Sequence, residues 1–401
     1  MRILFCNYEY PPLGGGGGVV NAALATELAK RHDVTVLTSR ALGLPAESVE
    51  GNVRVIRVPV LFRRRHAVAN FPSMLAYVIA GVLRGRALVR AEEFDVVNTH
   101  FALPTGPVGH MVSRAAGVPN VLSVHGGDLY DPSKFSSAHR HASLRACVSR
   151  LARAADRVVA QSLDTEENLR HFFAPDVKAE VIPLGIAEPP VTAAARRDHG
   201  FGDDDVLLVS IGRLVRRKSV EHLLDVVAEL RDERVKLLLI GDGPQLPFLR
   251  DQARRLRVES RVRFLGMVDE RTKFELLSIS DIYVSASQHE GFGLVFLEAM
   301  ASGVPVICYD RGGQRDFLTE GRNGHLVARN DKAALVEACR RLIAAPEQRA
   351  EMGRVNRQDA RQFYIDRCAR RYEELFESVI RARAMEVSPA EGAEHAAGSA
   401  K

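Results

Sequence analysis

The sequence predicts an α/β protein with two parallel sheets, and two observations support that prediction. Short apolar segments alternate with helix-length segments, which is typical of open parallel sheets with helices on both faces. This series starts anew at Val206, after a polar, proline-containing stretch from Pro189 to Gly202 that has the composition of a linker. A chain of 401 residues is long enough for two such domains. We therefore predict two Rossmann-like domains, covering residues 1–188 and 189–365.

The first domain is expected to begin with a buried strand. Arg2–Cys6 is a continuous apolar run, as in strands that are buried on both faces of a parallel sheet. A glycine-rich turn and a helix from about Val19 to Arg31 follow. Further strands are expected at 33–38, 53–60, 94–100, 118–125, 156–162 and 178–186.

The second domain repeats the alternation of strands and helices. Its strands are expected to begin near Val206, Leu237, Arg263, Asp281 and Val304. A final helix is predicted over 364–385. Residues 386–401, rich in Ala, Gly, Ser and Glu, are expected to form a disordered tail.

The net charge, the cysteines and the apolar runs limit which partners and which cellular compartment are expected. A formal net charge of +5 suits anionic ligands or a membrane surface, but it is too weak to indicate nucleic acid. Five scattered cysteines without paired spacing indicate reduced thiols of a cytoplasmic protein. The chain enters a strand directly at Met1, so no signal peptide is expected. The longest apolar run, Met74–Leu83, is too short to span a bilayer.

The most informative stretch is His289–Met300, which follows a predicted buried strand and passes through two glycines into a helix. Free N–H groups and the helix dipole make such a turn suitable for a phosphate. Glu290 precedes the turn, and Glu298 lies about 8 Å along the helix axis at ~1.5 Å per residue. This order would suit the sugar, diphosphate and ribose of a nucleotide sugar. In the alternative interpretation, Glu290 caps the helix and Glu298 is a solvated helix residue.

Two further turns lie where ligands of parallel sheets bind, at the carboxyl ends of predicted strands. Gly212–Lys218 contains three arginines and a lysine, which suit a diphosphate, although a solvated charged turn is the alternative. Tyr10–Gly18 contains five glycines but no phosphate-loop lysine, so alone it indicates a flexible loop. His125-Gly-Gly-Asp128 ends another strand, where an isolated histidine is more often structural.

These motifs together resemble the GT-B glycosyltransferases of family four (glycosyl transferases group 1), which are retaining enzymes. The resemblance rests on His-Glu-Gly-Phe-Gly-Leu with Glu298, on Gly-Arg-Leu-x-x-x-Lys at 212–218, and on His-Gly-x-Asp at 125–128. It covers about residues 1–385 and is strongest in the second half. Ala187, Ser219 and Asp316 depart from the family pattern, and Asp316 leaves detail near the acceptor open.

The resemblance implies two domains that face each other across a cleft, with a helix over 366–385 that crosses back to the first. It also implies residue roles. The catalytic residues would be His125, Glu290, Arg213 and Lys218; donor contacts would come from Gly15, Gly16, Gly241, Met267, Val268, Phe292, Gly293, Leu294, Val295 and Glu298; Asp128 would lie on the acceptor side.

The function expected from this resemblance is metal-independent transfer of a hexose from a UDP- or GDP-sugar to a sugar, glycolipid or small-molecule hydroxyl. The donor is a co-substrate, and no cofactor is expected. Asp203–Asp205 is interpreted as a solvated turn, not a metal site, because it precedes a strand. The alternatives are a phosphorylase or sugar-nucleotide epimerase on the same fold, and a non-catalytic nucleotide-sugar-binding protein.

A basic and apolar segment raises the question of membrane contact. Leu61–His66 contains Arg63, Arg64 and Arg65, and it precedes the apolar stretch Phe71–Leu83. Such a segment can lie on an anionic leaflet, which would place the protein on the inner face of the cell membrane beside a lipid-linked acceptor. A core-packed helix with a solvated basic loop is the alternative and is slightly favoured. The sequence leaves the oligomeric state open.

Overall fold

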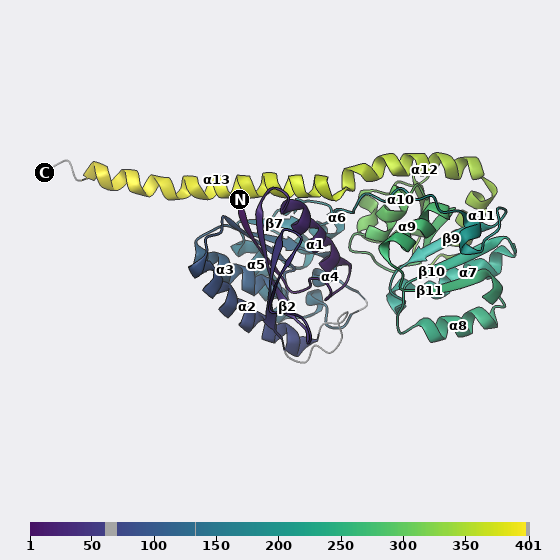
Figure 1. The fold of residues 1–401 in the computed structure, drawn as a ribbon, viewed down its shortest axis with the longest axis horizontal. Coiled ribbons are helices and arrows are strands. Elements are labelled where there is room, and N and C mark those ends of the chain that lie inside the picture. Colours follow the sequence, from purple (N-terminus) through teal and green to yellow (C-terminus); the bar gives the residue numbers. More distant parts are fainter. Residues whose placement is uncertain (61–69, 133, 398–401) are drawn as a thin grey trace. The chain divides into compact units, whose positions relative to one another are not determined.

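The computed structural model of the chain describes residues 1–60, 70–132 and 134–397. Contacts divide the chain into two compact units (Figure 1). Unit 1 comprises Met1–Gly185 and Ile365–Lys401, and unit 2 comprises Ile186–Tyr364. The first boundary, at Gly185, lies close to residue 188, where the linker composition placed it. The second boundary assigns the helix after Tyr364 to unit 1.

Unit 1 contains an eight-stranded sheet in the order β3-β4-β2-β1-β5-β6-β7-β8. All neighbouring strands are parallel except β3 and β4, which pair antiparallel. The strands are β1 (Arg2–Asn7), β2 (Asp33–Arg40), β3 (Glu47–Glu50), β4 (Val53–Pro59), β5 (Val96–His100), β6 (Asn120–Val124), β7 (Arg157–Ala160) and β8 (Glu180–Val181). Strand β3 was not expected, because its exposed, mostly polar residues carry no apolar pattern and it forms by pairing with β4.

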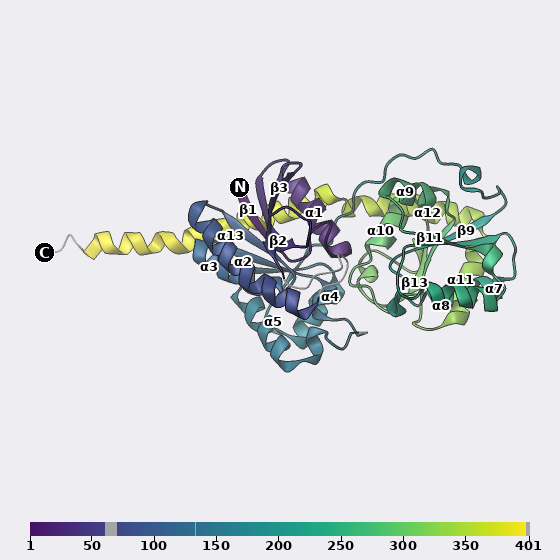
Figure 2. The same cartoon turned by 60° about the horizontal axis from the view of Figure 1, so that its bottom comes forward.

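Helices cover both faces of this sheet, as expected. They are α1 (Gly16–Leu28), α2 (Phe71–Ala91), α3 (Thr105–Ala116), α4 (Gly126–Leu129), α5 (Ala142–Ala154), α6 (Leu163–Phe172) and α13 (Ile365–Ala397). Side chains of α1 and α13 pack with Ile3, Phe5 and Val34 on one face. On the other face, Leu4 and Cys6 pack with Tyr77 of α2 and Val108 of α3. Helices α2 and α3 lie side by side in both views (Figures 1 and 2).

Helix α13 corrects one expectation. It continues to Ala397, so residues 386–397 are helical where a disordered tail over 386–401 was expected; residues 398–401 lie outside the described residues. Seven of these twelve residues are alanine or glutamate, which have high intrinsic helix propensity, whereas Pro389 and Gly392 oppose the helix. The apolar face of the helix, including Tyr372 and Phe376, is buried on the sheet of unit 1.

Helix α2 is well defined at its start, where the Asn70 side chain accepts a hydrogen bond from the Ser73 N–H at 2.8 Å. Within the described ranges, it is the one helix that is long and apolar enough to cross a membrane, judged by length and composition alone. The uninterrupted apolar run Met74–Leu83 is shorter than this helix, because Arg84 and Arg86 interrupt the apolar sequence. A helix packed on a domain core passes the same test, and Tyr77 and Leu88 of α2 are buried.

Unit 2 contains a six-stranded, all-parallel sheet in the order β11-β10-β9-β12-β13-β14. Its strands are β9 (Val206–Ile211), β10 (Val235–Ile240), β11 (Val262–Gly266), β12 (Ile282–Ser285), β13 (Val306–Tyr309) and β14 (Gly324–Val327). Its helices are α7 (Val220–Leu230), α8 (Leu246–Arg255), α9 (Glu270–Ile279), α10 (Leu294–Ala301), α11 (Lys332–Ala344) and α12 (Pro346–Ala360).

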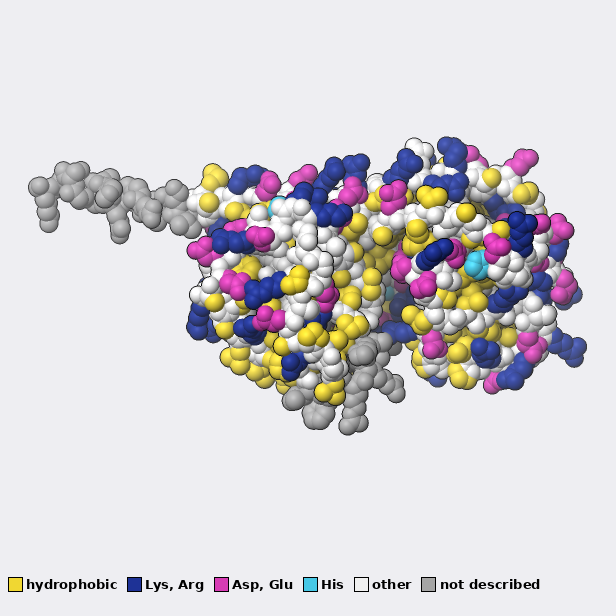
Figure 3. Space-filling model, in the orientation of Figure 1, with side chains coloured by type: hydrophobic (Ala, Val, Ile, Leu, Met, Phe, Trp, Pro, Cys, Tyr) yellow, Lys and Arg dark blue, Asp and Glu magenta, His cyan; other side chains and the backbone are white. Residues whose placement is uncertain are grey.

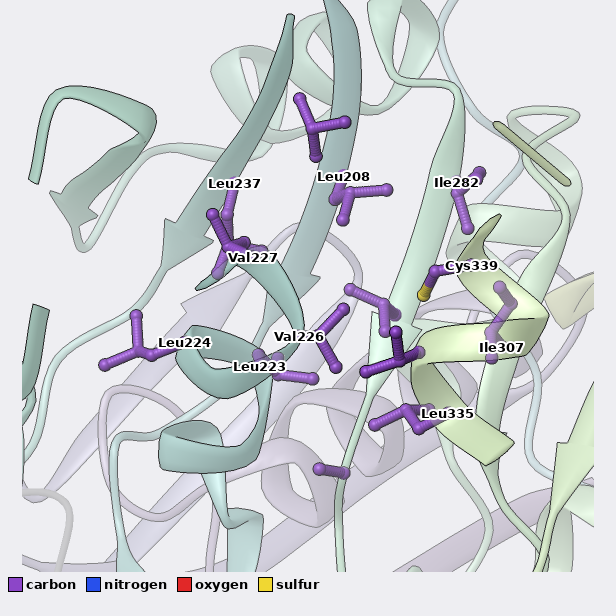
Figure 4. Close-up of a cluster of buried hydrophobic side chains, with 14 of the residues drawn as sticks. Leu208, Leu223, Leu224, Val226, Val227, Leu237, Ile282, Ile307, Leu335 and Cys339 are labelled. Atoms are coloured by element: carbon purple, nitrogen blue, oxygen red, sulfur yellow. The ribbon is translucent and has the colours of Figure 1, made fainter. Parts of the chain in front are cut away.

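The core of unit 2 lies between the sheet and helices α7, α8 and α11. Figure 4 shows part of this cluster. Strand residues Leu208, Leu237, Ile282 and Ile307 lie with Leu223, Leu224, Val226 and Val227 of α7 and with Leu335 and Cys339 of α11. All of them are at most 1% exposed, so the sheet is firmly held and its carboxyl edge is a stable platform.

The strand orders locate one switch point in each sheet. In unit 1 the connections diverge on either side of β1 and β5, and in unit 2 on either side of β9 and β12. Ligands of open α/β sheets bind outside the carboxyl ends of the strands at such a point. The turns after β1 and β5 contain the glycine-rich segment and Phe101; those after β9 and β12 contain Gly212–Lys218 and Ser287–Gly293.

Candidate functional site

In unit 2, the turn between β12 and α10 is shaped by a glycine with a left-handed backbone. Gly293 is the N-cap of α10, with φ +100°, and a Cβ there would lie 2.7 Å from Cδ2 of Phe296. Leu294 and Val295 are the first residues of the helix, where amides have no intrahelical acceptor. The Phe292 side chain packs against Phe317, with ring centroids 5.3 Å apart, so only its backbone remains to contact a ligand.

The structure brings Lys218 and Glu290 together from the two turns. The Lys218 ammonium donates a hydrogen bond to Glu290 Oε1, and Arg217 Nη1 lies 3.6 Å from Oε2. Burial raises the pKa of Glu290, but the charges of Lys218 and Arg217 outweigh that effect and lower it to about 2. Glu290 is therefore an ionised carboxylate, 8% exposed, beside two cations.

The backbone of Glu290 is fixed from the neighbouring loop. Its carbonyl accepts a hydrogen bond from the Gly313 N–H at 2.9 Å, and a Cβ on Gly312 would lie 2.1 Å from that carbonyl oxygen. Gly312 has φ +117°, so any other residue there would be strained. These contacts hold the carboxylate in place before any ligand binds.

The side chain of Arg213, unlike those of Arg217 and Lys218, is exposed. Its guanidinium makes no hydrogen bond or ion pair with the residues that the structure describes, although its backbone carbonyl accepts a hydrogen bond from the Val215 N–H at 2.9 Å. It lines a small cavity at the carboxyl ends of β9, β10 and β12 together with Ser210, Gly212, Lys218 and Ser285. A Cβ on Gly241 would lie 2.1 Å from the Gly212 carbonyl, so Gly241 is required for the close approach of two strand ends.

Glu298 has one oxygen bound and one free. Its Oε1 accepts a hydrogen bond from Lys273 Nζ at 2.8 Å, and Lys273 also binds both oxygens of Glu270 at 2.9 Å. Glu298 Oε2 is buried and has no hydrogen-bond partner among the described residues. Burial raises the pKa of Glu298, and Lys273 opposes that rise. Oε2 is thus an acceptor without a partner that lies out of contact with solvent.

Met267 and Val268 follow β11, the edge strand of the sheet in unit 2. They lie at the same carboxyl edge, but β10 and β9 separate β11 from β12 and its turn. The Met267 side chain is 80% exposed. The structure therefore leaves both residues apart from the Lys218–Glu290 pair, at a place that only an extended ligand could reach.

In unit 1, the glycine-rich turn leads into α1. Gly15 is the N-cap, its N–H donates to Glu9 Oε2 at 3.2 Å, and a Cβ there would meet nothing within 4 Å. Gly16 is the first residue of the helix. At Gly17 a Cβ would lie 2.9 Å from Cζ of Phe101, and at Gly14, which has φ +101°, it would lie 2.7 Å from Cβ of Glu9. Tight contacts thus lie on both sides of the predicted pair, Gly15 and Gly16, whose donor-binding role stays a prediction.

His125 lies at the end of β6, 5% exposed, and its ring stacks on Phe101 with centroids 4.0 Å apart. Asp128 accepts hydrogen bonds from the backbone N–H of His125 at 2.9 Å and of Ala102 at 2.6 Å. Burial raises the pKa of Asp128 to about 7, against the lowering effect of these amide donors. Both carboxyl oxygens therefore hold the backbone of unit 1, and the acceptor-side role stays a prediction.

Several residues of these sites were missed by sequence reasoning. Arg217, Lys273, Phe101, His100 and Gln161 all contact a predicted site residue. Of these residues, Phe101 could have been suspected from the sequence, because it directly follows a predicted strand. In the structure its φ is +71°, which is unusual for an aromatic residue. Over the described ranges, no group of three or more His, Cys, Asp or Glu residues could hold a metal ion.

Known protein families and known proteins match this chain over most of its length. The profile described as Glycosyltransferase Family 4 matches residues 14–188, and that described as Glycosyl transferases group 1 matches residues 191–359. Glycogen synthase of Mycobacterium tuberculosis is 30% identical over 377 residues, covering 88% of this chain and 89% of that protein. N-acetyl-alpha-D-glucosaminyl L-malate synthase of Bacillus anthracis is 27% identical over 387 residues, covering 93% and 96%.

Among solved structures, sucrose-phosphate synthase of Thermosynechococcus elongatus has the same fold. The TM-score is 0.83 at 23% sequence identity, with 95% of this chain and 100% of that chain covered. The likeness therefore extends over both units and confirms the predicted pair of Rossmann-like domains.

Proposed function

Because the chain belongs to the group 1 glycosyl transferases and has the GT-B fold, we propose that it moves a hexose from a UDP- or GDP-sugar to an acceptor hydroxyl with retention of configuration. The protein is a transferase, so the non-catalytic alternative is set aside. One relative is named for the small acid L-malate and another for the polysaccharide glycogen. We therefore keep the acceptor to a sugar, a glycolipid or a small molecule.

The observation that carries this proposal is the Lys218–Glu290 pair beside the start of α10. The diphosphate would bind the α10 amides and Lys218, with the free guanidinium of Arg213 as a further cation. Glu290 would hold hydroxyls of the donor sugar, and Glu298 Oε2 would accept a ribose hydroxyl. His125, Gly15, Gly16, Gly241, Met267 and Val268 keep the roles that the family resemblance implies.

The reaction requires little covalent chemistry from the protein. The C1–O bond to the diphosphate breaks, the acceptor oxygen bonds to C1 from the same face, and the acceptor proton passes to the leaving phosphate. Positive charge develops at C1 and negative charge on the diphosphate. Preorganised cations stabilise that negative charge. We propose that they do so without a divalent metal; survival of activity in EDTA would support this, and loss that Mg²⁺ or Mn²⁺ restores would contradict it.

A donor panel tests the proposal directly. UDP-, GDP- and ADP-sugars would be compared by thermal shift and by slow donor hydrolysis, with wild type and Lys218→Ala, and with Lys332→Ala as an exposed-lysine control. We expect one nucleotide class to stabilise wild type and the control but not Lys218→Ala. Absence of stabilisation by every donor would contradict the proposal. Turnover that requires inorganic phosphate would favour a phosphorylase, and conversion of donor without acceptor an epimerase.

We further propose that the exposed face of α2 binds an anionic lipid surface. Phe71, Leu75, Ile79 and Leu83 recur every four residues, and all are more than 50% exposed. The stripe runs about 18 Å along the helix at ~1.5 Å per residue. Figure 3 shows hydrophobic side chains gathered at the lower edge of unit 1, over α2.

Exposed arginines lie beyond the end of this apolar stripe. Arg86 and Arg90 follow it on the exposed side of α2, and Arg114 of α3 lines the same hollow as Arg86. These three arginines make no ion pair with other described residues, so their charge is available to lipid phosphates. Each contributes about 1 kcal/mol near an anionic surface. Arg63, Arg64 and Arg65, on which the sequence-based hypothesis rested, lie outside the described residues.

Liposome co-sedimentation tests this part of the proposal. Anionic and neutral vesicles would be compared for wild type, for Leu75→Ser with Ile79→Ser, and for Arg86→Ser with Arg90→Ser. Leu42→Ser, at a residue of unit 1 that is 91% exposed and lies outside the stripe, is the matched control. We expect wild type and the control to pellet with anionic vesicles, and both double variants to stay in solution. Equal pelleting of all variants, or of none, would contradict the membrane role.

A further inference from the structure

A chain of buried polar side chains lies beneath His125 in unit 1. Its Nε2 lies 2.8 Å from the side-chain nitrogen of Gln161 and 3.3 Å from Nδ1 of His100. Nε2 of His100 in turn lies 2.9 Å from the side-chain nitrogen of Asn98. The four residues are at most 5% exposed. Of the four, only His125 belongs to a motif to which the proposed function assigns a role.

The hydrogen-bond directions fix where the protons are. Ser123 Oγ donates to the Asn98 oxygen at 3.2 Å, so the Asn98 NH₂ group faces His100. An amide NH₂ can only donate, and Nε2 of His100 must therefore accept. The proton of neutral His100 is then on Nδ1, which donates to His125.

The hydrogen-bond partners of His125 fix the tautomer of its ring as well. Nε2 of His125 faces two donors, Nδ1–H of His100 and the NH₂ group of Gln161. It must accept from both, so the proton of a neutral His125 ring is on Nδ1. Both rings are neutral, because burial lowers the pKa of His100 to about 3 and, with His100 nearby, lowers that of His125 well below its usual value.

The other side of the His125 ring faces the glycine-rich segment. Its Nδ1 is 3.7 Å from the position that a Cβ would take on Gly17, and the ring makes its hydrogen bonds to Gln161 and His100 through Nε2. The stacked ring of Phe101 holds the plane of the imidazole. The Nδ1–H group is thus oriented by its surroundings and is available to a ligand.

We propose that Gln161 and His100 are positioning residues that hold His125 as a neutral Nδ1–H donor toward a substrate oxygen at the glycine-rich turn. The identity of that substrate rests on the proposed function, in which positive charge develops at C1 of the donor sugar. A neutral donor can orient a sugar oxygen without adding positive charge beside that carbon. An imidazolium would oppose the charge that develops there.

Two substitutions separate positioning from simple support of the fold. Gln161→Met keeps the length of the side chain but removes the donor, and we expect kcat to fall about tenfold while KM for the donor changes little. Gln161→Glu replaces a donor by a carboxylate that can only accept, which favours a proton on Nε2 of His125. We expect a larger loss of kcat than for Gln161→Met. Gln348→Glu, the same substitution at an exposed residue of α12, is the control.

The decisive measurement is the tautomer itself, read from ¹⁵N–¹H correlation spectra of the ¹⁵N-histidine-labelled full chain. His125→Ala identifies the signal by its disappearance. We expect the proton on Nδ1 in wild type and in the Gln348→Glu control, and on Nε2 in Gln161→Glu. A wild-type proton on Nε2 would overturn the proposal, as would Gln161 variants with unchanged tautomer and turnover. The spectra require no transfer activity, so a failure of the proposed function would be seen separately, in the donor panel.

Discussion

The two sheets differ in the side chains that lie at their carboxyl edges, because unit 2 has ion-paired groups there and unit 1 has uncharged histidines. In unit 2, Lys218, Arg217 and Glu290 form a partly buried ion-paired group, and Lys273 joins Glu298 in a second one. At the corresponding edge of unit 1, His100 and His125 are buried without charge, in contact with amide side chains. The two sheets share one design, so the fold supplies the position of a site while a few side chains decide its charge.

This difference matters because charges and neutral donors respond differently to a ligand. The cations of unit 2 are paired with carboxylates, which offsets the cost of burying them. A diphosphate would compete for the same cations, so donor binding there should weaken with salt. The donor on His125 is neutral and should respond little to salt. The four experiments below test this contrast, from the largest expected effect to the smallest.

The largest effect is expected for Lys218→Ala, which removes a cation from the charged edge. Loss of one preorganised group that stabilises developing charge typically costs about 100- to 1,000-fold in kcat. Steady-state transfer assays would be paired with circular dichroism to confirm folding. Lys332→Ala, at an exposed lysine paired with Asp225, should keep wild-type turnover. Wild-type turnover by folded Lys218→Ala would remove Lys218 from the site.

A smaller loss is expected for His125→Ala at the neutral edge. Loss of a neutral hydrogen bond, together with the ring that stacks on Phe101, should lower kcat about 10- to 100-fold. His125→Asn should retain more activity, because its amide nitrogen can replace Nδ1. The loss should be the same at low and high ionic strength, unlike that of Lys218→Ala. His171→Ala, at an exposed histidine, is the control, and equal losses for His125→Ala and His125→Asn would contradict a donor role for Nδ1.

Glu298→Gln tests the second charged group. The free Oε2 would lose its charge, and donor affinity should fall about tenfold with little change in kcat, since a hydrogen bond to a charged group contributes about 1.5–3 kcal/mol. Isothermal titration with the nucleotide identified by the donor panel measures this. Glu337→Gln, at a half-exposed residue of α11, should bind like wild type. An unchanged dissociation constant for Glu298→Gln would mean that Oε2 contacts no donor hydroxyl.

The smallest effect is a pH dependence of stability. The pKa of Glu290 is depressed from 4.5 to about 2, so the stability it contributes is present above about pH 4.5 and is lost as the pH falls toward 2. Glu290→Gln should therefore melt a few degrees below wild type at pH 7, since about 1 kcal/mol shifts Tm by about 2–4 °C in a domain of this size. The difference should narrow as the pH is lowered from 4.5. Glu347→Gln, at an exposed residue, is the control, and a gap that does not depend on pH would contradict the assignment.

The sequence predicted both parallel sheets and the carboxyl-edge turns that contain Lys218 and Glu290. These predictions succeed because continuous apolar strands and glycine turns are local signals. The sequence did not reveal which arginine of 213–217 contacts Glu290, because a short 3-10 turn over Arg216–Lys218 decides that direction. It also did not reveal that Phe101 approaches Gly17, because that contact joins two turns that are far apart in the sequence.

Contacts between distant residues were the hardest to predict. Lys273 reaches Glu298 across 25 positions, and His125 meets Gln161 across 36. Neither lysine nor glutamine carries a local pattern that marks such a partner. The charge state of His100 and His125 also depends on packing. Both rings are neutral because several strands together bury them, which lowers the pKa of each ring. Such features follow from the fold, and a single sequence does not display them.

The discontinuity of unit 1 has a consequence for biosynthesis. Unit 2 is inserted between Gly185 and Ile365, and Tyr372 and Phe376 of α13 complete the core around Ile3 and Phe5. A ribosome therefore delivers the whole sheet of unit 1 long before the helix that covers it. Domains usually fold in the order of their synthesis, but here unit 2 can mature first while an apolar face of unit 1 stays uncovered. Translation speed and chaperone capture during that interval should govern the yield of the intact enzyme.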